Sequence, residues 1–387
     1  MEIDNVYRGR EHSYIKHELL KGYLEKLLLI VGTTGTKEIT YVACFAGPWG
    51  SEDESLAGTS IAISLEILEG VRSTLAAPPY NIGDLKLRAV YVEKLKRSHK
   101  RLTDYLTHNC PPSIEWHALH GDYSELQDEI LRRCGSEFAF FFIDPLGWTD
   151  IAIPKLRKLA RRPRSELLVT FMYDFVNRFI AKEELRRQIA EMLGTLDESD
   201  LLKIDASDPK AREAYVVRRY RDRLKEAVGP EGKEKPRAYH AVVMDRDKDR
   251  TKYHMVYVTR HPKGIKVFAE QSEKVEFIQK VVRIQAKRDA SGQGGLFPAE
   301  EEAELNEGID LVAVKTYWLA LLSTEPMPFG DDVLADMLET TGWLIRDFQQ
   351  AFGELLREGK VENIDAPGRR RIHFVHFDKA EKLRKLK

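Results

Sequence analysis

The chain has 387 residues, of which 43% are hydrophobic and 32% charged, and its formal net charge is −1. This composition is typical of a globular protein with an ordinary core and excludes a disordered or fibrous chain. No apolar run approaches the ~20 residues of a membrane-spanning helix. Three cysteines without metal-ligand spacing argue against a zinc site or a disulfide framework. We therefore expect a cytoplasmic protein without a metal site and without membrane association.

The first part of the chain alternates between strand and helix patterns. His12–Val31 repeats apolar residues at helical spacing and predicts a leading helix. The predicted strands are Glu38–Phe45, Lys86–Val92, Ile114–Leu119, Glu137–Ile143 and Glu166–Phe171. The predicted helices between them are Ser60–Ala76, Leu95–Leu106, Tyr123–Arg133 and Ile153–Ala160. Alternation of this kind with short turns predicts a parallel sheet with right-handed crossovers.

The next part of the chain, from Glu183 to Arg260, no longer alternates between strand and helix patterns. Glu183–Gly194 and Ala211–Val228 are predicted helices within a helical insertion at about 183–235. The strands Tyr239–Met244 and Tyr253–Arg260 are so close in the chain that they can pair only as an antiparallel hairpin. Strand–helix units followed by a hairpin are the order that class I methyltransferases use. We therefore expect a Rossmann-like α/β domain over residues 37–287, after a leading helical segment at 1–36.

The C-terminal part predicts a small second domain. Glu273–Lys287 is a predicted helix, and the Gly-rich and acidic residues 288–307 predict a linker. Residues 308–387 contain three predicted helices at Asp310–Ser323, Asp331–Glu339 and Leu344–Glu358, and two predicted strands at Val361–Ile364 and Arg371–Phe377 that pair across Pro367-Gly368. Three helices with a two-stranded wing are typical of a winged helix, a variant of the helix-turn-helix.

Candidate functional residues follow the predicted parallel strands, because ligands bind beyond the carboxyl ends of such strands. Phe45-Ala46-Gly47-Pro48-Trp49-Gly50 is either a ligand-binding turn or a plain tight loop. Glu93 stands where a ribose is held in dinucleotide sites, and is otherwise a surface residue. Asp122 can accept a hydrogen bond from an adenine amino group, cap the helix predicted at Tyr123, or do both.

The sharpest motif is Asp144-Pro145-Leu146-Gly147-Trp148, directly after the most apolar strand. A carboxylate at this position can accept from an exocyclic amine and orient its nitrogen toward an activated methyl group. Trp148 and Phe171 are aromatic residues that can stack on a base. The alternative is an Asp-Pro turn with Trp148 packed in the core.

Basic clusters occur at Lys155–Arg164, Arg218–Arg223 and Arg369–Arg371. They indicate either phosphate-binding patches or ordinary solvated faces. In the tail, Leu344–Glu358 is the candidate recognition helix with Arg346 facing a groove, and Arg369–Arg371 would follow phosphates from the wing. A protein-docking module is the alternative for this domain, since many winged helices bind proteins.

Four short motifs in order resemble the three-Cys-motif partner protein (TcmP) family, over about residues 10–270. They are Lys16-His17 with Leu20 and Tyr23-Leu24, then Phe45-Ala46-Gly47-Pro48, then Phe142-Ile143-Asp144-Pro145-Leu146-Gly147, and then Tyr257 with His261 and Lys263-Gly264. The resemblance implies a methyltransferase-like domain and a partner protein with a three-cysteine motif of the radical-SAM kind. The Asp144 turn also resembles the active-site turn of the tRNA guanine-N2 methyltransferases and, more loosely, the Asp-Pro-Pro-aromatic turn of adenine-N6 methyltransferases.

The resemblance and the strand-end residues together give these candidates. The cofactor would be S-adenosylmethionine, held by Phe45, Gly47, Gly50, Glu93 and Asp122. The catalytic residues would be Asp144, Pro145, Gly147 and Trp148. Nucleic acid would be bound by Arg161, Arg162, Arg164, Arg346, Arg369, Arg370 and Arg371.

Two positions depart from the methyltransferase pattern. Ala43 stands where an acid is usual, and Gly147 where the catalytic turn has an aromatic residue.

Our leading hypothesis is a methyltransferase that acts on an amino nitrogen of a nucleic-acid base, with RNA favoured over DNA. The alternative is a catalytically degenerate adaptor that serves the three-Cys-motif protein.

Overall fold

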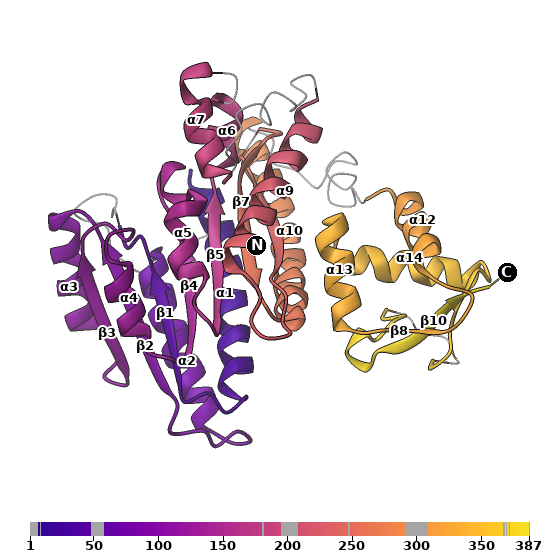
Figure 1. Cartoon of the computed structure of the whole chain (residues 1–387), viewed down its shortest axis with the longest axis horizontal. Coiled ribbons are helices and arrows are strands. Elements are labelled where there is room, and N and C mark those ends of the chain that lie inside the picture. Colours follow the sequence, from indigo (N-terminus) through magenta and orange to yellow (C-terminus); the bar gives the residue numbers. More distant parts are fainter. Residues whose placement is uncertain are drawn as a thin grey trace. The chain divides into compact units, whose positions relative to one another are not determined.

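The computed structural model describes residues 7, 9–47, 58–179, 182–194, 208–246, 248–291, 309–366, 368, 370 and 372–386. The chain divides into unit 1, Met1–Arg260, and unit 2, His261–Lys387 (Figure 1). The expected boundary lay further along, after residue 287. The unit boundary lies earlier because the helix after Arg260 packs with the C-terminal helices α13 (Asp331–Thr341) and α14 (Ile345–Arg357).

Unit 1 is a mixed α/β domain of the Rossmann-like type. In the described part of the chain, seven strands form one sheet in the order β3-β2-β1-β4-β5-β7-β6. The strands are β1 Glu38–Ala43, β2 Lys86–Glu93, β3 Ile114–His120, β4 Phe138–Ile143, β5 Ser165–Phe171, β6 Arg237–Met244 and β7 Thr251–Thr259. β1 to β5 pair in parallel, and β7 pairs antiparallel to both β5 and β6. The predicted parallel sheet with a hairpin at one edge is therefore confirmed.

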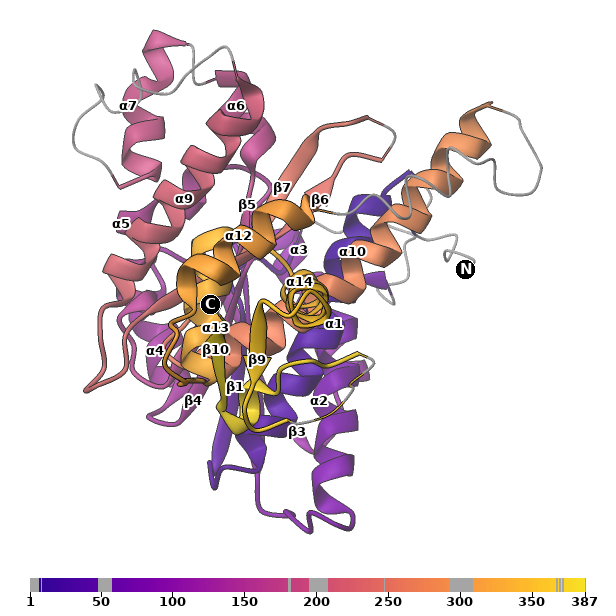
Figure 2. The ribbon, with the colours of Figure 1, turned by 90° about the vertical axis from the view of Figure 1, so that its right-hand side faces the viewer.

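Helices cover both faces of this sheet. They are α1 Glu11–Gly32, α2 Ser60–Ala76, α3 Lys96–Asn109, α4 Gln127–Cys134, α5 Ile153–Ala160, α6 Tyr173–Phe179, α7 Glu183–Met192 and α9 Pro209–Val228, with a 3-10 turn at Thr149–Ile151. Figure 2 shows α1 and α2 side by side along one face, and α5 and α9 along the other. Successive residues of β4 bury alternate side chains in the two layers. Phe140 packs against Tyr23 of α1, while Phe141 joins the core beneath α5 and α9.

Two helices of unit 1 differ most from the sequence predictions. α4 begins at Gln127 rather than Tyr123, because the carboxylate of Asp122 accepts hydrogen bonds from the amide and hydroxyl of Ser124 and closes a separate turn there. α6 was not predicted at all. It has only seven residues, fewer than the helical period needs for a clear pattern.

Unit 2 combines helices with a small antiparallel sheet. Its elements are α10 Pro262–Ser291, α12 Leu311–Leu321, β8 Met327–Phe329, α13 Asp331–Thr341, α14 Ile345–Arg357, β9 Val361–Asn363, a 3-10 turn Phe377–Lys379 and β10 Glu381–Lys385. The strands pair in the order β8-β10-β9. Trp318 of α12 is fully buried, and its indole nitrogen donates to the carbonyl of Phe348 at 3.0 Å. This residue joins α12 to α14 at the centre of the unit.

The predicted strand Arg371–Phe377 is wrong. β9 pairs instead with β10, which begins four residues after Phe377. The side chain of Gln349 on α14 binds the backbone of Phe374 and Val375 through both its oxygen and its nitrogen, so this segment is not available to pair as a strand. β8 was not predicted, because Pro328 sits in the middle of only three residues. Most of the expected linker, residues 292–307, lies outside the described residues.

Candidate functional site

The residues that follow β1, β2 and β3 lie side by side at the carboxyl edge of the sheet. The amide of Cys44 donates to the carbonyl of Phe142 at 3.0 Å, and the amide of Ala46 donates to that of Val92 at 2.8 Å. The chain after β1 therefore runs between the ends of β4 and β2. The amide of Gly121 donates to the carbonyl of Glu93 at 3.1 Å, which joins the β3 end to the same edge.

The loop after β1 supplies Phe45 and Gly47. The Phe45 ring packs against Tyr123 in the turn after β3, with ring centroids 5.0 Å apart. This contact fixes the position of the Phe45 side chain. Gly47 is half-buried. Gly50, with Pro48 and Trp49, lies outside the described residues.

Glu93 is held at the end of β2. Only 6% of the residue is exposed, and its Oε1 atom accepts from the amide of Leu95 at 2.6 Å. The alternative that Glu93 is a surface residue is therefore wrong. A carboxylate accepts up to about four hydrogen bonds, so the contact with Leu95 orients the group without saturating it.

Asp122 carries a firmly charged carboxylate. Partial burial alone would raise its pKa, but the hydrogen bonds from Ser124 and Lys94 outweigh burial and lower the pKa to about 2. The Lys94 ammonium lies 3.0 Å from Oδ2. Asp122 is therefore an acceptor at neutral pH, and it also closes the turn after β3.

Asp144 forms an ion pair that the sequence did not predict. Its Oδ2 atom binds the ammonium of Lys16 from α1, and the two side chains are only 16% and 14% exposed. The neighbouring His17 is neutral, because burial and the adjacent cations lower its pKa to about 3. Lys16 and His17 had entered the sequence analysis only as part of a family motif. Spacing cannot reveal a contact between residues this far apart in the chain.

The rest of the Asp144 turn departs from the prediction. Trp148 is 9% exposed and lies in the main core, so the alternative of a core tryptophan is confirmed and its ring offers little free surface on which a base could stack. Phe171 is fully buried against Tyr220, with ring centroids 4.4 Å apart, and cannot stack on a base either. Pro145 is buried and Gly147 has open space beside it. Leu146, which had no assigned role, is 73% exposed.

The arginines before β5 do not belong to this site. Arg161, Arg162 and Arg164 precede the amino end of β5, whereas Asp144 follows the carboxyl end of the adjacent β4. The seven residues of β5 place these two edges ~20 Å apart. The three arginines therefore cannot hold a polynucleotide against Asp144.

Their contacts also show what two of them do. Arg162 is 8% exposed and donates to carbonyls, which are those of Cys134, Gly135, Glu137, Pro163 and Arg164. Arg164 lies 3.0 Å from the carboxylate of Glu137. The contacts of Arg162 and Arg164 hold loops together at the amino edge of the sheet, although Arg164, like Arg161, is exposed.

In unit 2 the predicted contact arginines are paired with acids. Arg346 lies 2.8 Å from the carboxylate of Glu276 on α10. Arg370 binds both oxygens of Glu381, at 2.9 and 2.7 Å. Arg369 and Arg371 lie outside the described residues. The guanidinium of Arg370 thus fixes the segment before β10 instead of facing a phosphate.

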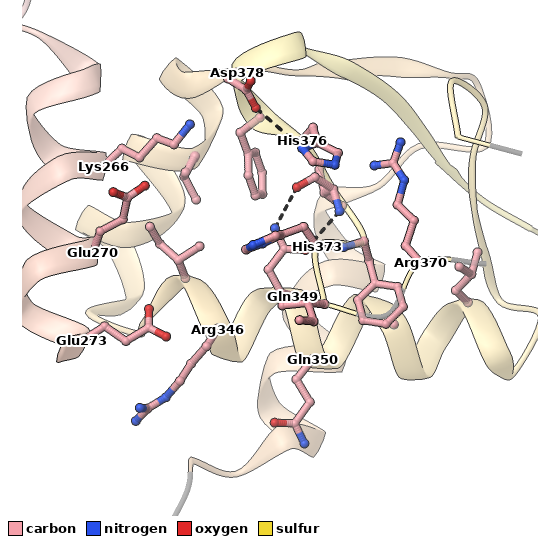
Figure 3. A pocket seen from close by; sticks show the side chains of 18 of the residues that line it. Lys266, Glu270, Glu273, Arg346, Gln349, Gln350, Arg370, His373, His376 and Asp378 are labelled. Carbon is pink, nitrogen blue, oxygen red and sulfur yellow. Dashed lines mark hydrogen bonds and ion pairs between the residues drawn. The ribbon is translucent and has the colours of Figure 1, made fainter. Parts of the chain in front are cut away.

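The exposed side of α14 lies at the bottom of a groove (Figure 3). α10 forms one wall with Lys266, Glu270 and Glu273, and Arg370 with residues 372–378 forms the other. A recognition helix must protrude to enter a DNA major groove, which is about 12 Å wide. The concave setting of α14 and the carboxylates on α10 therefore favour the protein-docking alternative over a duplex reader.

Two further observations bear on chemistry and context. Among the residues that the structure describes, no three His, Cys, Asp or Glu side chains are grouped to hold a metal ion, and no helix is long and apolar enough to cross a membrane. No protein-family model matches the chain, and no curated protein matches it either.

Proposed function

We propose that unit 1 is a class I S-adenosylmethionine-dependent methyltransferase domain that acts on an amino nitrogen of an RNA base. The observation that carries this proposal is the sheet order, with β7 antiparallel between β5 and β6, combined with a carboxylate at the end of each of β2, β3 and β4. A dinucleotide-binding domain of the dehydrogenase type has a different strand order, 3-2-1-4-5-6.

The residues at the edge of β1, β2 and β3 fit an adenosine-containing cofactor. The buried Glu93 carboxylate keeps acceptor capacity for the two ribose hydroxyls. Asp122 stays charged and can accept from the adenine amine. Gly47 lets the backbone come close to the ligand. The cofactor, when bound, supplies a methyl group on a positively charged sulfur.

Asp144 is the residue that would position the target amine. Its Oδ2 atom already binds a nitrogen cation, that of Lys16, so this carboxylate is placed and oriented to bind N–H groups. An exocyclic amine of a base would donate to Asp144, and that hydrogen bond would turn the nitrogen lone pair toward the methyl group. The contribution of Asp144 would be orientation, because a sulfonium methyl group needs no further activation. As the C–S bond breaks and the N–C bond forms, the cofactor would leave as a neutral thioether, and the methylated nitrogen would then lose one proton to solvent.

Calorimetry followed by a transfer assay tests this proposal. We expect wild-type protein to bind S-adenosylmethionine and Glu93→Ala to bind it at least tenfold more weakly. Asp144→Asn should keep cofactor affinity and lose most methyl transfer to bulk RNA. No binding by the wild type at millimolar cofactor would remove the methyltransferase proposal.

A second candidate function is a non-catalytic adaptor. The ammonium of Lys16 fills the place on Asp144 that a substrate amine would need, and Ala43, fully buried in β1, replaces the usual acid. Unit 2 would then be a winged-helix module whose groove binds a protein partner with a three-cysteine motif. Cofactor binding without transfer to RNA or DNA would favour this candidate.

A further inference from the structure

We infer that α6 and the β6–β7 hairpin form a binding surface for single-stranded RNA beside Asp144. This surface, here called the α6 surface, consists of Phe175, Arg178, Phe179 and Lys182 on and just after α6, and Arg246 and Arg250 in the hairpin. α6 and α7 stand beyond the carboxyl end of β5 in Figure 1, on the edge of the sheet that carries the candidate site.

Aromatic and basic side chains alternate on and just after α6, in the order Phe175, Arg178, Phe179 and Lys182. The guanidinium of Arg178 lies 5.8 Å from the centre of the Phe175 ring, and the ammonium of Lys182 lies 5.1 Å from that of Phe179. Both phenylalanines are half-buried and pack against the core, so the protein fixes their orientation while leaving part of each ring exposed. Aromatic rings beside cations are the elements with which proteins bind single strands.

One carboxylate joins α6 to the hairpin. Asp174 lies 2.9 Å from Arg178 and 3.5 Å from Arg250, while only 10% of its side chain is exposed. Arg178 and Arg250 are themselves 55% and 43% exposed. Asp174 thus brings the two guanidinium groups together. Arg250 also pairs with Asp245, at 2.6 Å, so these four side chains carry no net charge, while both guanidinium groups remain partly exposed to solvent.

The same hairpin reaches the candidate site. The hydroxyl of Tyr253 donates to the carbonyl of His12 at 2.6 Å, and Arg246 lies 3.5 Å from Glu11, so the hairpin contacts the first turn of α1. Lys16, one turn further along α1, binds Asp144. Contacts therefore connect Asp144 to the hairpin and the hairpin to α6, on one edge of the sheet.

A single strand fits this arrangement better than a duplex. The Asp144 side chain is only 16% exposed, and a base can reach such a carboxylate only when it is unstacked from its neighbours. Acids such as Glu183 and Glu184 also occur among the cations. They disfavour phosphates but can accept from a 2′-hydroxyl, which favours RNA over DNA. The choice of RNA rests on the proposed function, whereas the position of the surface rests on the contacts above.

Fluorescence anisotropy with a labelled mixed-sequence single-stranded RNA tests the inference on the full chain without cofactor. We expect Arg178→Gln/Lys182→Gln to weaken binding at least tenfold and to reduce the slope of log affinity against log salt by about 1.4, the value for two fewer phosphate contacts on a single strand. Phe175→Leu/Phe179→Leu keeps apolar packing but removes the rings, and should also weaken binding at least tenfold. The matched control is Lys158→Gln/Arg161→Gln, which removes two charges near the opposite edge and should bind as wild type does.

Each outcome decides the inference. The lysine and arginine changes are on the surface, so they report on binding even if the phenylalanine variant is unstable, which its circular dichroism would show. Three results would overturn the inference of an RNA-binding α6 surface. They are wild-type affinity in the Arg178→Gln/Lys182→Gln variant, equal weakening in the control, and no RNA binding by the wild type. Equal affinity for DNA of the same sequence would overturn the choice of RNA. Loss of cofactor binding alone would remove the methyltransferase proposal and leave this surface in place.

Discussion

Lys16 on α1 and Asp144 after β4 form an ion pair between two side chains that are largely shielded from water. The pair joins the leading helix to the turn that follows the central strand. It gives the leading helix a role at the candidate site, where the sequence had indicated only an amphipathic segment before the sheet.

Removal of the Lys16 charge should destabilise unit 1. Lys16→Met leaves the Asp144 carboxylate partly buried without its cation, and we expect the free energy of unfolding to fall by about 1–3 kcal/mol. Lys16→Arg should recover part of the loss. Urea denaturation measures these values. Lys37→Met is the control, because the Lys37–Asp84 pair is 72% and 70% exposed and its loss should leave stability unchanged.

Tyr23 is the centre of a buried polar network that joins α1 to β5 and β7. Its hydroxyl lies 2.7 Å from Glu166 on β5 and 2.5 Å from the hydroxyl of Tyr257 on β7. Tyr23→Phe removes one partner of a buried carboxylate, and we expect a loss of about 1–3 kcal/mol in urea denaturation. Tyr80→Phe, at a residue that is 45% exposed, should change nothing. Equal stability of wild type and Tyr23→Phe would show that Glu166 does not depend on this bond.

The pKa of His17 predicts how stability depends on pH. Burial first, and then the charge of Lys16, lower this pKa from 6.5 to about 3. Between these pH values the unfolded chain binds a proton at His17 that the folded chain does not bind. The stability contribution of neutral His17 is therefore complete above pH 6.5 and is lost as the pH falls toward 3.

The variant His17→Gln isolates this contribution. Stability of the wild type should fall more steeply than that of His17→Gln between pH 6.5 and pH 4, by up to ~1.4 kcal/mol per pH unit. Urea denaturation at several pH values measures both slopes. The other buried histidines are present in both proteins and cancel in the difference. Parallel curves for the two proteins would contradict the assignment.

The sequence predicted the parts of the fold that depend on local pattern. The five parallel strands and the hairpin are each marked by continuous or alternating apolar residues between turns, and all appear in the sheet. The carboxylates Glu93, Asp122 and Asp144 could be placed at the correct edge for the same reason, since they follow directly after strands. The residues that these three carboxylates contact could not be predicted from the sequence.

What failed were predictions that depend on contacts distant in the chain. Charge runs gave no indication that Arg162 is buried among carbonyls while Arg178 is exposed beside an aromatic ring. Nor could spacing show that Gln349 binds the segment expected to form a strand. In each case the deciding partner belongs to another element, so only the three-dimensional fold brings the two residues together.

Arg162 provides the last test, because it separates a structural arginine from a nucleic-acid-binding one. Its guanidinium donates to the carbonyls of Cys134, Gly135 and Glu137, before β4, and to those of Pro163 and Arg164, before β5. Arg162→Met leaves these buried acceptors without a donor. We expect a loss of about 3 kcal/mol or more in urea denaturation, from several charge-assisted bonds at about 1.5–3 kcal/mol each that are only partly replaced by water.

The lysine variant makes the test sharper. Lys retains the charge but cannot present the planar set of donors, so Arg162→Lys should recover less than half of the lost stability. Arg161→Gln, at the exposed neighbour, should leave stability unchanged. RNA affinity of folded Arg162→Lys should match that of wild type, since its contacts lie at the edge of the sheet opposite to Asp144. Full stability with reduced RNA affinity would mean that the side chain faces a phosphate after all.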